Sequence, residues 1–153
     1  MIVVSDTSPL TALLTVGQAD LLPKLFKEVA IPAAVEIELL RCHSPLPAWL
    51  RVVRVNDAAK VKKYLLRVDA GEAEAIALAE QIKADRVLMD ERKGRRLARE
   101  HGLAVVGLLG VVLLARQKKL IPSARNLLAA LDHEAGIYLG EDLKAAALKS
   151  VGE

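Results

Sequence analysis

Short apolar runs that alternate with helical patterns are the feature of this sequence that most constrains its fold. The first run, Ile2-Val3-Val4, is β-branched and is followed by Asp, Thr, Ser and Pro, so it predicts a buried strand that ends in a turn. Similar runs predict strands at 28–31, 86–89 and 104–106, and an edge strand at 51–55. Because helical patterns separate these strands, we expect a three-layer α/β/α domain with a central, mainly parallel sheet of about four or five strands.

Composition narrows the class of protein. The 153 residues, 53% of them hydrophobic, suit one compact domain over residues 1–153. Cys42 is the only cysteine, which excludes an internal disulfide framework and predicts a reducing, cytoplasmic location. No basic segment precedes the first apolar run, and the apolar stretch 103–115 is too short to span a bilayer, so we expect neither a signal peptide nor a membrane partner.

The overall charge and the aromatic content bear on possible partners. A net charge of +3 is compatible with a polyanionic partner without requiring one. Aromatic residues make up only 3% of the chain, which argues against a surface that stacks nucleic-acid bases on aromatic rings.

Two acidic residues directly follow predicted strands. Asp6 comes after the first strand and Asp90 after the strand at 86–89. Functional sites of open parallel sheets form beyond the carboxyl ends of the strands, so both residues are candidates for a site. Glu38 and Glu74, in the helical segments between these strands, complete a candidate quartet. Clustered carboxylates need a cation, and hard oxygen ligands favour Mg²⁺ or Mn²⁺, which support phosphodiester hydrolysis.

Each of these four residues also has a structural interpretation. Asp6 could cap the helix that begins near Pro9, and Asp90 could cap the basic helix that follows it. Glu38 and Glu74 could be solvated helix residues, and spacing alone favours that interpretation for these two.

Four segments, VVSDTSPL at 3–10, IPAAVEIEL at 31–39, GEAEAIALA at 71–79 and VLMDER at 87–92, together resemble the four motifs of PIN domains. The first segment resembles the opening motif, in which an apolar strand precedes Asp and a pair of hydroxyl residues. The other three resemble the second, third and fourth motifs, in the same order and at similar spacing. The later stretch 107–114 is similar to the branch of prokaryotic PIN proteins close to VapC toxins.

The resemblance implies a function and a set of site residues. It implies a metal-dependent ribonuclease, the toxin of a toxin–antitoxin pair, in which Mg²⁺ or Mn²⁺ is held by Asp6, Glu38, Glu74 and Asp90. Ser8 would fix the Asp6 carboxylate or a metal-bound water. The partners implied are an RNA substrate, an antitoxin protein and a second copy of the chain in a homodimer.

Two registers and the number of metals stay open. Glu36 competes with Glu38, and Glu72 competes with Glu74, because residues two positions apart lie on different faces of a helix. We prefer the second of each pair from the motif match. After Asp90, the fourth motif lacks the further acidic or Asn residue of many toxin relatives, so the site could hold one metal or two.

A basic helix follows the proposed site. Arginines recur at i, i+3, i+4 and i+7 in the order Arg92, Arg95, Arg96, Arg99 and form one stripe. The stripe could be a solvated face or could bind phosphate, and we take Arg92, Arg95 and Arg96 as candidate substrate-binding residues. Arg96 could instead pair with a carboxylate of the site.

Two other kinds of function fit parts of the pattern. One is a catalytically inactive PIN-like module that only binds RNA or protein. The presence of all four carboxylates argues against this alternative. The other is a phosphoryl-transfer domain that uses Asp6, such as a receiver or a haloacid-dehalogenase-like phosphatase. The phosphatase pattern requires a second Asp where this chain has Ser8, and the acidic pair and late Lys of a receiver are not evident.

Overall fold

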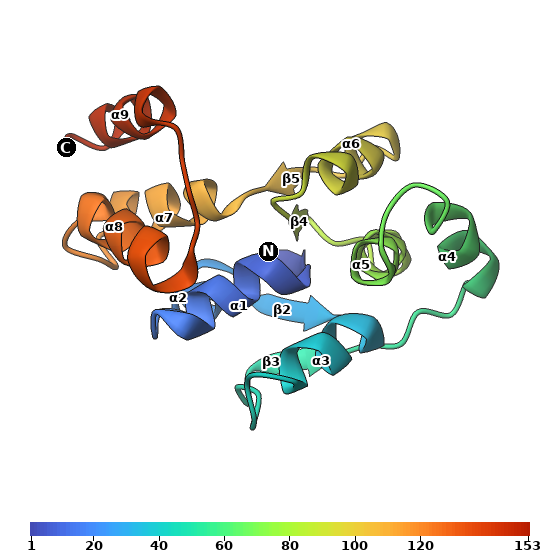
Figure 1. Cartoon of the computed structure of the whole chain (residues 1–153). Helices are drawn as coiled ribbons and strands as arrows, with labels where there is room; N and C mark the ends of the chain where they lie inside the picture. Colours follow the sequence, from blue (N-terminus) through green and yellow to red (C-terminus); the bar gives the residue numbers. More distant parts are fainter.

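The computed structural model describes residues 1–153 and contains the predicted parallel sheet (Figure 1). All four neighbouring strand pairs are parallel, and the strand order is β3-β2-β1-β4-β5. The strands are β1 (Ile2–Ser5), β2 (Glu28–Ile31), β3 (Leu50–Val52), β4 (Arg86–Leu88) and β5 (Val105–Val106). The prediction of a mainly parallel sheet with four or five strands is therefore confirmed.

Helices cover both faces of the sheet. They are α1 (Thr7–Thr15), α2 (Leu21–Leu25), α3 (Ala33–Leu40), α4 (Ala58–Tyr64), α5 (Ala70–Gln81), α6 (Arg92–Glu100), α7 (Leu108–Gln117), α8 (Ala124–Ala135) and α9 (Glu141–Ser150). Figure 1 shows α4, α5 and α6 on one side of the sheet and α1, α2, α7 and α8 on the other. No helix combines the length and the apolar character that a membrane crossing requires.

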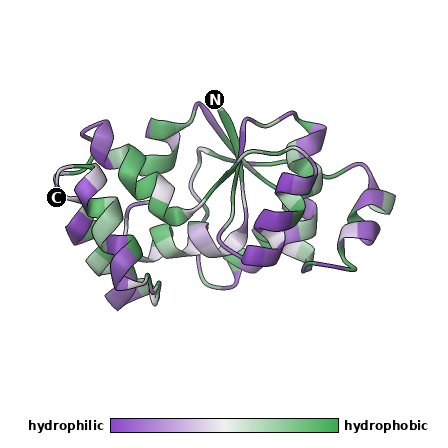
Figure 2. Cartoon of the chain, turned by 90° about the horizontal axis from the view of Figure 1, so that it is seen from above, coloured by the Kyte–Doolittle hydropathy of each residue, from purple (hydrophilic) through white to green (hydrophobic).

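Alternation along the strands divides the core into two parts. Successive strand residues point to opposite faces, so Val3 joins the larger cluster, with residues of α1, α2, α7 and α8, while Val4 joins the smaller one, with residues of α5 and α6. Both residues are fully buried. Seen from above, the strands form the hydrophobic centre of the molecule (Figure 2). The three layers are thus a consequence of strands that are apolar on both faces.

The edge strand β3 is shorter than predicted. It occupies Leu50–Val52 instead of 51–55, and Val53 N makes the next hydrogen bond, to Ile31 O at 2.9 Å. Ile31 is the last residue of β2, so the neighbouring strand offers no partner for the remaining alternating residues. The chain then leaves the sheet toward α4.

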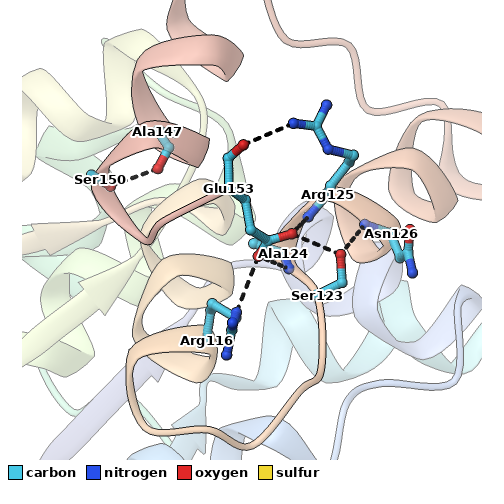
Figure 3. A network of polar contacts seen from close by, with 8 residues as sticks. All are labelled: Arg116, Ser123, Ala124, Arg125, Asn126, Ala147, Ser150 and Glu153. Carbon is cyan, nitrogen blue, oxygen red and sulfur yellow. Dashed lines mark hydrogen bonds and ion pairs between the residues drawn. The ribbon is translucent and has the colours of Figure 1, made fainter.

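A carboxylate joins the three C-terminal helices. The Glu153 side chain accepts hydrogen bonds from Ala124 N (2.7 Å) and Ser123 Oγ (2.8 Å) at the start of α8, and from Arg116 Nε of α7 (3.1 Å) (Figure 3). Glu153 directly follows the turn that ends α9. One side chain therefore connects the segment after α9 to both α7 and α8.

The strand register brings the two predicted strand-end acids to the same edge. Ser5 of β1 is paired with Leu88 of β4, and Asp6 N donates to Leu88 O at 2.9 Å. Asp6 and Asp90 therefore follow neighbouring parallel strands, as predicted, beyond their carboxyl ends.

Candidate active site

Asp6 lies at the N-terminus of α1, but its side chain does not cap that helix. The residue occupies the N-cap position with extended backbone and makes no side-chain capping hydrogen bond. It is only 5% exposed. The pKa of Asp6 is raised from 3.8 to about 7, mainly by burial. The Thr7 amide partly offsets this increase, and the negative charges of Glu72, Asp69 and Glu38 contribute to it. The carboxyl group thus lies among other carboxylates, close to the first amide of α1.

Acidic residues from four parts of the chain surround Asp6. A hollow of about 470 Å³ is lined by five of them, namely Asp6, Glu38, Asp69, Glu72 and Glu91. Glu38 comes from α3, which packs against both α1 and α5, so its position follows from that packing. Glu36, the alternative to Glu38, does not line the hollow.

Gly71 allows the carboxylates to approach the backbone of α5. A Cβ atom at this position would lie 2.9 Å from Glu38 Oε1 and 3.3 Å from Asp6 Oδ1. Both carboxylates therefore converge on the first turn of α5, where any side chain would displace at least one of them.

Thr7 adds a hydroxyl group at the same point. Its Oγ1 would be 3.5 Å from a Cβ on Gly71, and it is a buried side-chain atom with no hydrogen-bond partner in the protein. Buried hydroxyl groups are normally paired, so this atom is available to a water or a ligand among the carboxylates. Ser8, the hydroxyl residue predicted for this role, is exposed and also lines the hollow. The hydroxyl pair after Asp6 was the signal that could have identified Thr7.

Glu72, and not Glu74, is the α5 glutamate that faces the hollow. Asp69 and Glu72 form a capping box: Asp69 Oδ1 accepts from Glu72 N (2.8 Å), and Glu72 Oε2 accepts from Asp69 N (3.1 Å). This box fixes Glu72 at the end of α5 that lies over Asp6. Burial raises the pKa of Glu72, and the charges of Asp69, Glu91 and Glu38 add to the increase despite the Asp69 amide.

Glu74, the expected member of the quartet on α5, lies away from the hollow. Two residues correspond to about 200° around a helix, which turns Glu74 away from Glu72. Glu74 Oε1 instead accepts a hydrogen bond from Ala34 N, in the first turn of α3, at 3.2 Å. Glu74 therefore stabilises the helix that carries Glu38, and it does not line the hollow.

Asp90 lies beside the hollow and not inside it. Its Oδ1 accepts a hydrogen bond from Leu108 N at 2.9 Å, which caps α7 instead of the basic helix considered from the sequence. Although the residue as a whole is exposed, desolvation of its carboxyl group raises the pKa of Asp90, against the lowering effects of the Leu108 amide and Arg95. Glu91 is the residue of this segment that reaches the hollow.

The donor chemistry fits a hard divalent cation. All acidic groups of the hollow offer carboxylate oxygens, and Thr7 offers an unpaired hydroxyl oxygen, which are the ligands that Mg²⁺ and Mn²⁺ prefer. The side chains as they stand do not form a group of three that converges tightly enough to hold one ion. A cation would therefore draw the carboxylates inward.

The basic helix α6 presents only part of its arginine stripe to the site. Arg92, Arg95 and Arg99 line a second hollow of about 270 Å³ together with Asp90, and Arg95 Nη1 donates to Met89 O at 3.2 Å. Arg96, an expected substrate-binding residue, instead pairs with Glu100 at 3.5 Å, and its side chain is 78% exposed. Arg99 takes its place in this hollow.

Comparison with known proteins identifies a family model. A model described as a PIN domain matches residues 2–153, which is nearly the whole chain. A search of curated proteins finds no match.

Proposed function

We propose that this chain, which belongs to the PIN-domain family, is a metal-dependent ribonuclease that hydrolyses phosphodiester bonds in single-stranded or structured RNA. PIN domains are commonly metal-dependent nucleases. The observation that carries the proposal is the buried Asp6, whose pKa is raised to about 7 in a hollow lined by four further carboxylates. Carboxylates packed this closely raise one another's pKa, and a bound cation would relieve their repulsion. This arrangement is therefore typical of a cation site.

We assign the cation, Mg²⁺ or Mn²⁺, to Asp6, Glu38 and Glu72, with Thr7 or Ser8 available to orient a water molecule. Asp90 is the fourth carboxylate of the proposal, because it ends the neighbouring strand and its Oδ2 makes no hydrogen bond in the protein. The bound cation would supply an activated water and stabilise the leaving oxygen. Arginines 92, 95 and 99 would bind the phosphates of the RNA and neutralise their charge.

The proposal is tested by cleavage of an end-labelled single-stranded RNA. Purified protein with Mn²⁺ should cleave the RNA, excess chelator should abolish cleavage, and Asp6→Asn should be inactive. Circular dichroism shows whether the variant is folded. Cleavage that persists undiminished in the chelator, or in folded Asp6→Asn, would contradict the assignment. Folded wild type that binds RNA but never cleaves it would favour the inactive binding module.

We further propose that the enzyme is the cytoplasmic toxin of a toxin–antitoxin pair and acts as a homodimer. The support is the similarity of residues 107–114 to the VapC-like branch and the mild positive charge of the chain. Expression of wild type, but not of Asp6→Asn, should arrest growth, and co-expression of a neighbouring antitoxin gene should relieve the arrest. Light scattering at micromolar concentration should give twice the chain mass, and a monomer mass would contradict the dimer.

A further inference from the structure

A second cavity lies next to the carboxylate hollow and differs from it in chemistry. It has a volume of about 590 Å³, and ten of its fourteen lining residues are hydrophobic. Its walls come from β5, α7, α8 and the segment that leads into α9, and they are aliphatic, with residues such as Leu109, Leu113 and Ile137. Cavities of about 300–1,000 Å³ with mostly apolar walls and a few polar groups are typical of sites for small organic ligands.

The polar end of this cavity is shared with the arginine hollow. Asp90 and Arg95 line both spaces, so the apolar cavity lies beside the hollow that Arg92, Arg95 and Arg99 line. Gly107 lies at this junction: a Cβ there would be 2.5 Å from Arg95 Nη1 and 3.0 Å from Asp90 Oδ1. The glycine therefore lets Arg95 and Asp90 lie against the backbone where the two spaces meet.

The two adjacent spaces match the two halves of a nucleotide. The flat, apolar faces of a base suit the aliphatic walls of the cavity, and a phosphate suits the arginines beside its mouth. The same mouth includes Asp90, the neighbour of Asp6 at the sheet edge, so a nucleotide placed here would lie next to the proposed cleavage site. An apolar protein segment would also fill the cavity, but it would leave the three arginines without a matching charge.

We propose that this cavity binds one unpaired nucleobase of the RNA substrate, with the adjoining phosphate on the arginines of α6. This inference rests on the proposed function and specifies its substrate: RNA in which a base beside the cut site can leave the stack, as in single strands, loops and bulges. Because the aliphatic walls offer few hydrogen-bond partners, recognition depends on buried apolar area, and purines bind more tightly than pyrimidines.

The inference can be tested without catalysis. We measure binding of AMP and of ribose 5-phosphate to the full chain in the presence of chelator, by NMR titration. AMP should bind about tenfold more tightly than ribose 5-phosphate, because only AMP carries a base. Equal affinities would overturn the inference, since they would show that the arginines bind phosphate alone.

A matched pair of variants locates the base. Leu113 and Leu114 are neighbours on α7 and both are half-buried, but only Leu113 lines the cavity. Leu113→Gln should weaken AMP about tenfold and leave ribose 5-phosphate unchanged, whereas Leu114→Gln should change neither, provided that both variants melt near the wild-type temperature. Similar effects of the two variants on AMP would overturn the inference.

Three further outcomes separate this inference from its alternatives. If AMP does not bind and Leu113→Gln converts a dimer to a monomer, the cavity is an interface between copies and the inference is overturned. If AMP binds as expected but RNA is never cleaved with Mn²⁺, the base site stands and the nuclease proposal fails. If RNA is cleaved but AMP binds no better than ribose 5-phosphate, the base site fails and the nuclease proposal stands.

Discussion

The fold holds the carboxyl group of Asp6 where burial and three other carboxylates oppose its negative charge. In the unfolded chain an aspartate loses its proton near pH 3.8, whereas in the folded chain Asp6 keeps it up to about pH 7. Between these pH values unfolding releases a proton, so the contribution of Asp6 to stability is complete below pH 3.8 and is lost as the pH rises toward 7. A divalent cation would compensate for this loss.

This linkage predicts a pH-dependent effect of Asp6→Asn in the absence of metal. Relative to the variant, the wild type should lose about 4 kcal/mol of unfolding free energy between pH 4 and pH 8, because a pKa raised from 3.8 to about 7 corresponds to that amount. Urea denaturation of both proteins with chelator checks it. Stability curves that stay parallel over this range would show that the Asp6 carboxyl group ionises normally.

At the scale of single elements, the sequence predicts strands and strand ends better than it predicts the faces of helices. Asp6 and Asp90 could be predicted because residues that follow parallel strands share one edge whatever the side chains do. The choice between Glu72 and Glu74 depends instead on the rotation of α5, which the Asp69 capping box and the contact of Glu74 with α3 determine. The capping box is a local signal that the sequence contains. The contact of Glu74 with α3 is a tertiary contact that no local pattern reveals.

In the basic helix α6, too, the sequence predicts the helix but not which of its faces lies toward the site. Spacing predicts a stripe of arginines, but Arg96 is drawn to Glu100 on the outer face while Arg99 reaches the hollow beside Asp90. The direction of the stripe relative to the site depends on how α6 packs on β5 and α5, which the sequence does not specify.

This arrangement predicts different effects of two substitutions that remove the same charge from the same helix. Arg99→Ala should weaken binding of single-stranded RNA and lower the slope of log affinity against log salt concentration by about 0.7, the value for one lost phosphate contact. Arg96→Ala should change both quantities much less, because its side chain faces away from the hollow. Fluorescence anisotropy between low and moderate salt, with chelator to prevent cleavage, measures both. A larger effect of Arg96→Ala would contradict the proposed path of the RNA.

At the scale of the whole molecule, the carboxylate hollow and the apolar cavity share the segment between α8 and α9. Ile137 lines both spaces, so the position of this segment affects both. Glu153 connects the chain after α9 to α7 and α8 through a set of hydrogen bonds that lowers the pKa of its carboxyl group to about 2 (Figure 3). One ionised side chain thus links the segment after α9 to α7 and α8, in addition to the packing of these helices in the core.

The Glu153 contacts predict a pH-dependent loss of stability on substitution. Since the pKa of Glu153 is lower in the folded chain than the usual 4.5, its contribution is complete above pH 4.5 and is lost as the pH falls toward 2. Glu153→Gln should therefore lower the melting temperature at pH 7 and have a smaller effect near pH 3. Glu134→Gln, an exposed carboxylate at the end of α8, serves as the control and should have little effect at either pH. Equal effects of the two substitutions would show that the Glu153 contacts do not stabilise the fold.

Comparison of the two glutamates of α5 shows whether the carboxylates around Asp6 hold the cation of a ribonuclease. Glu72→Gln and Glu74→Gln each remove one negative charge. Glu72→Gln keeps an oxygen that can accept from Asp69 N, and Glu74→Gln keeps one that can accept from Ala34 N. With Mn²⁺ and single-stranded RNA, Glu72→Gln should lower kcat/KM about a hundredfold or more, because even groups that only support a metal ligand contribute about 10–100-fold. Glu74→Gln should stay within a few-fold of wild type. Loss of cleavage in Glu74→Gln with full activity in Glu72→Gln would contradict the site described above.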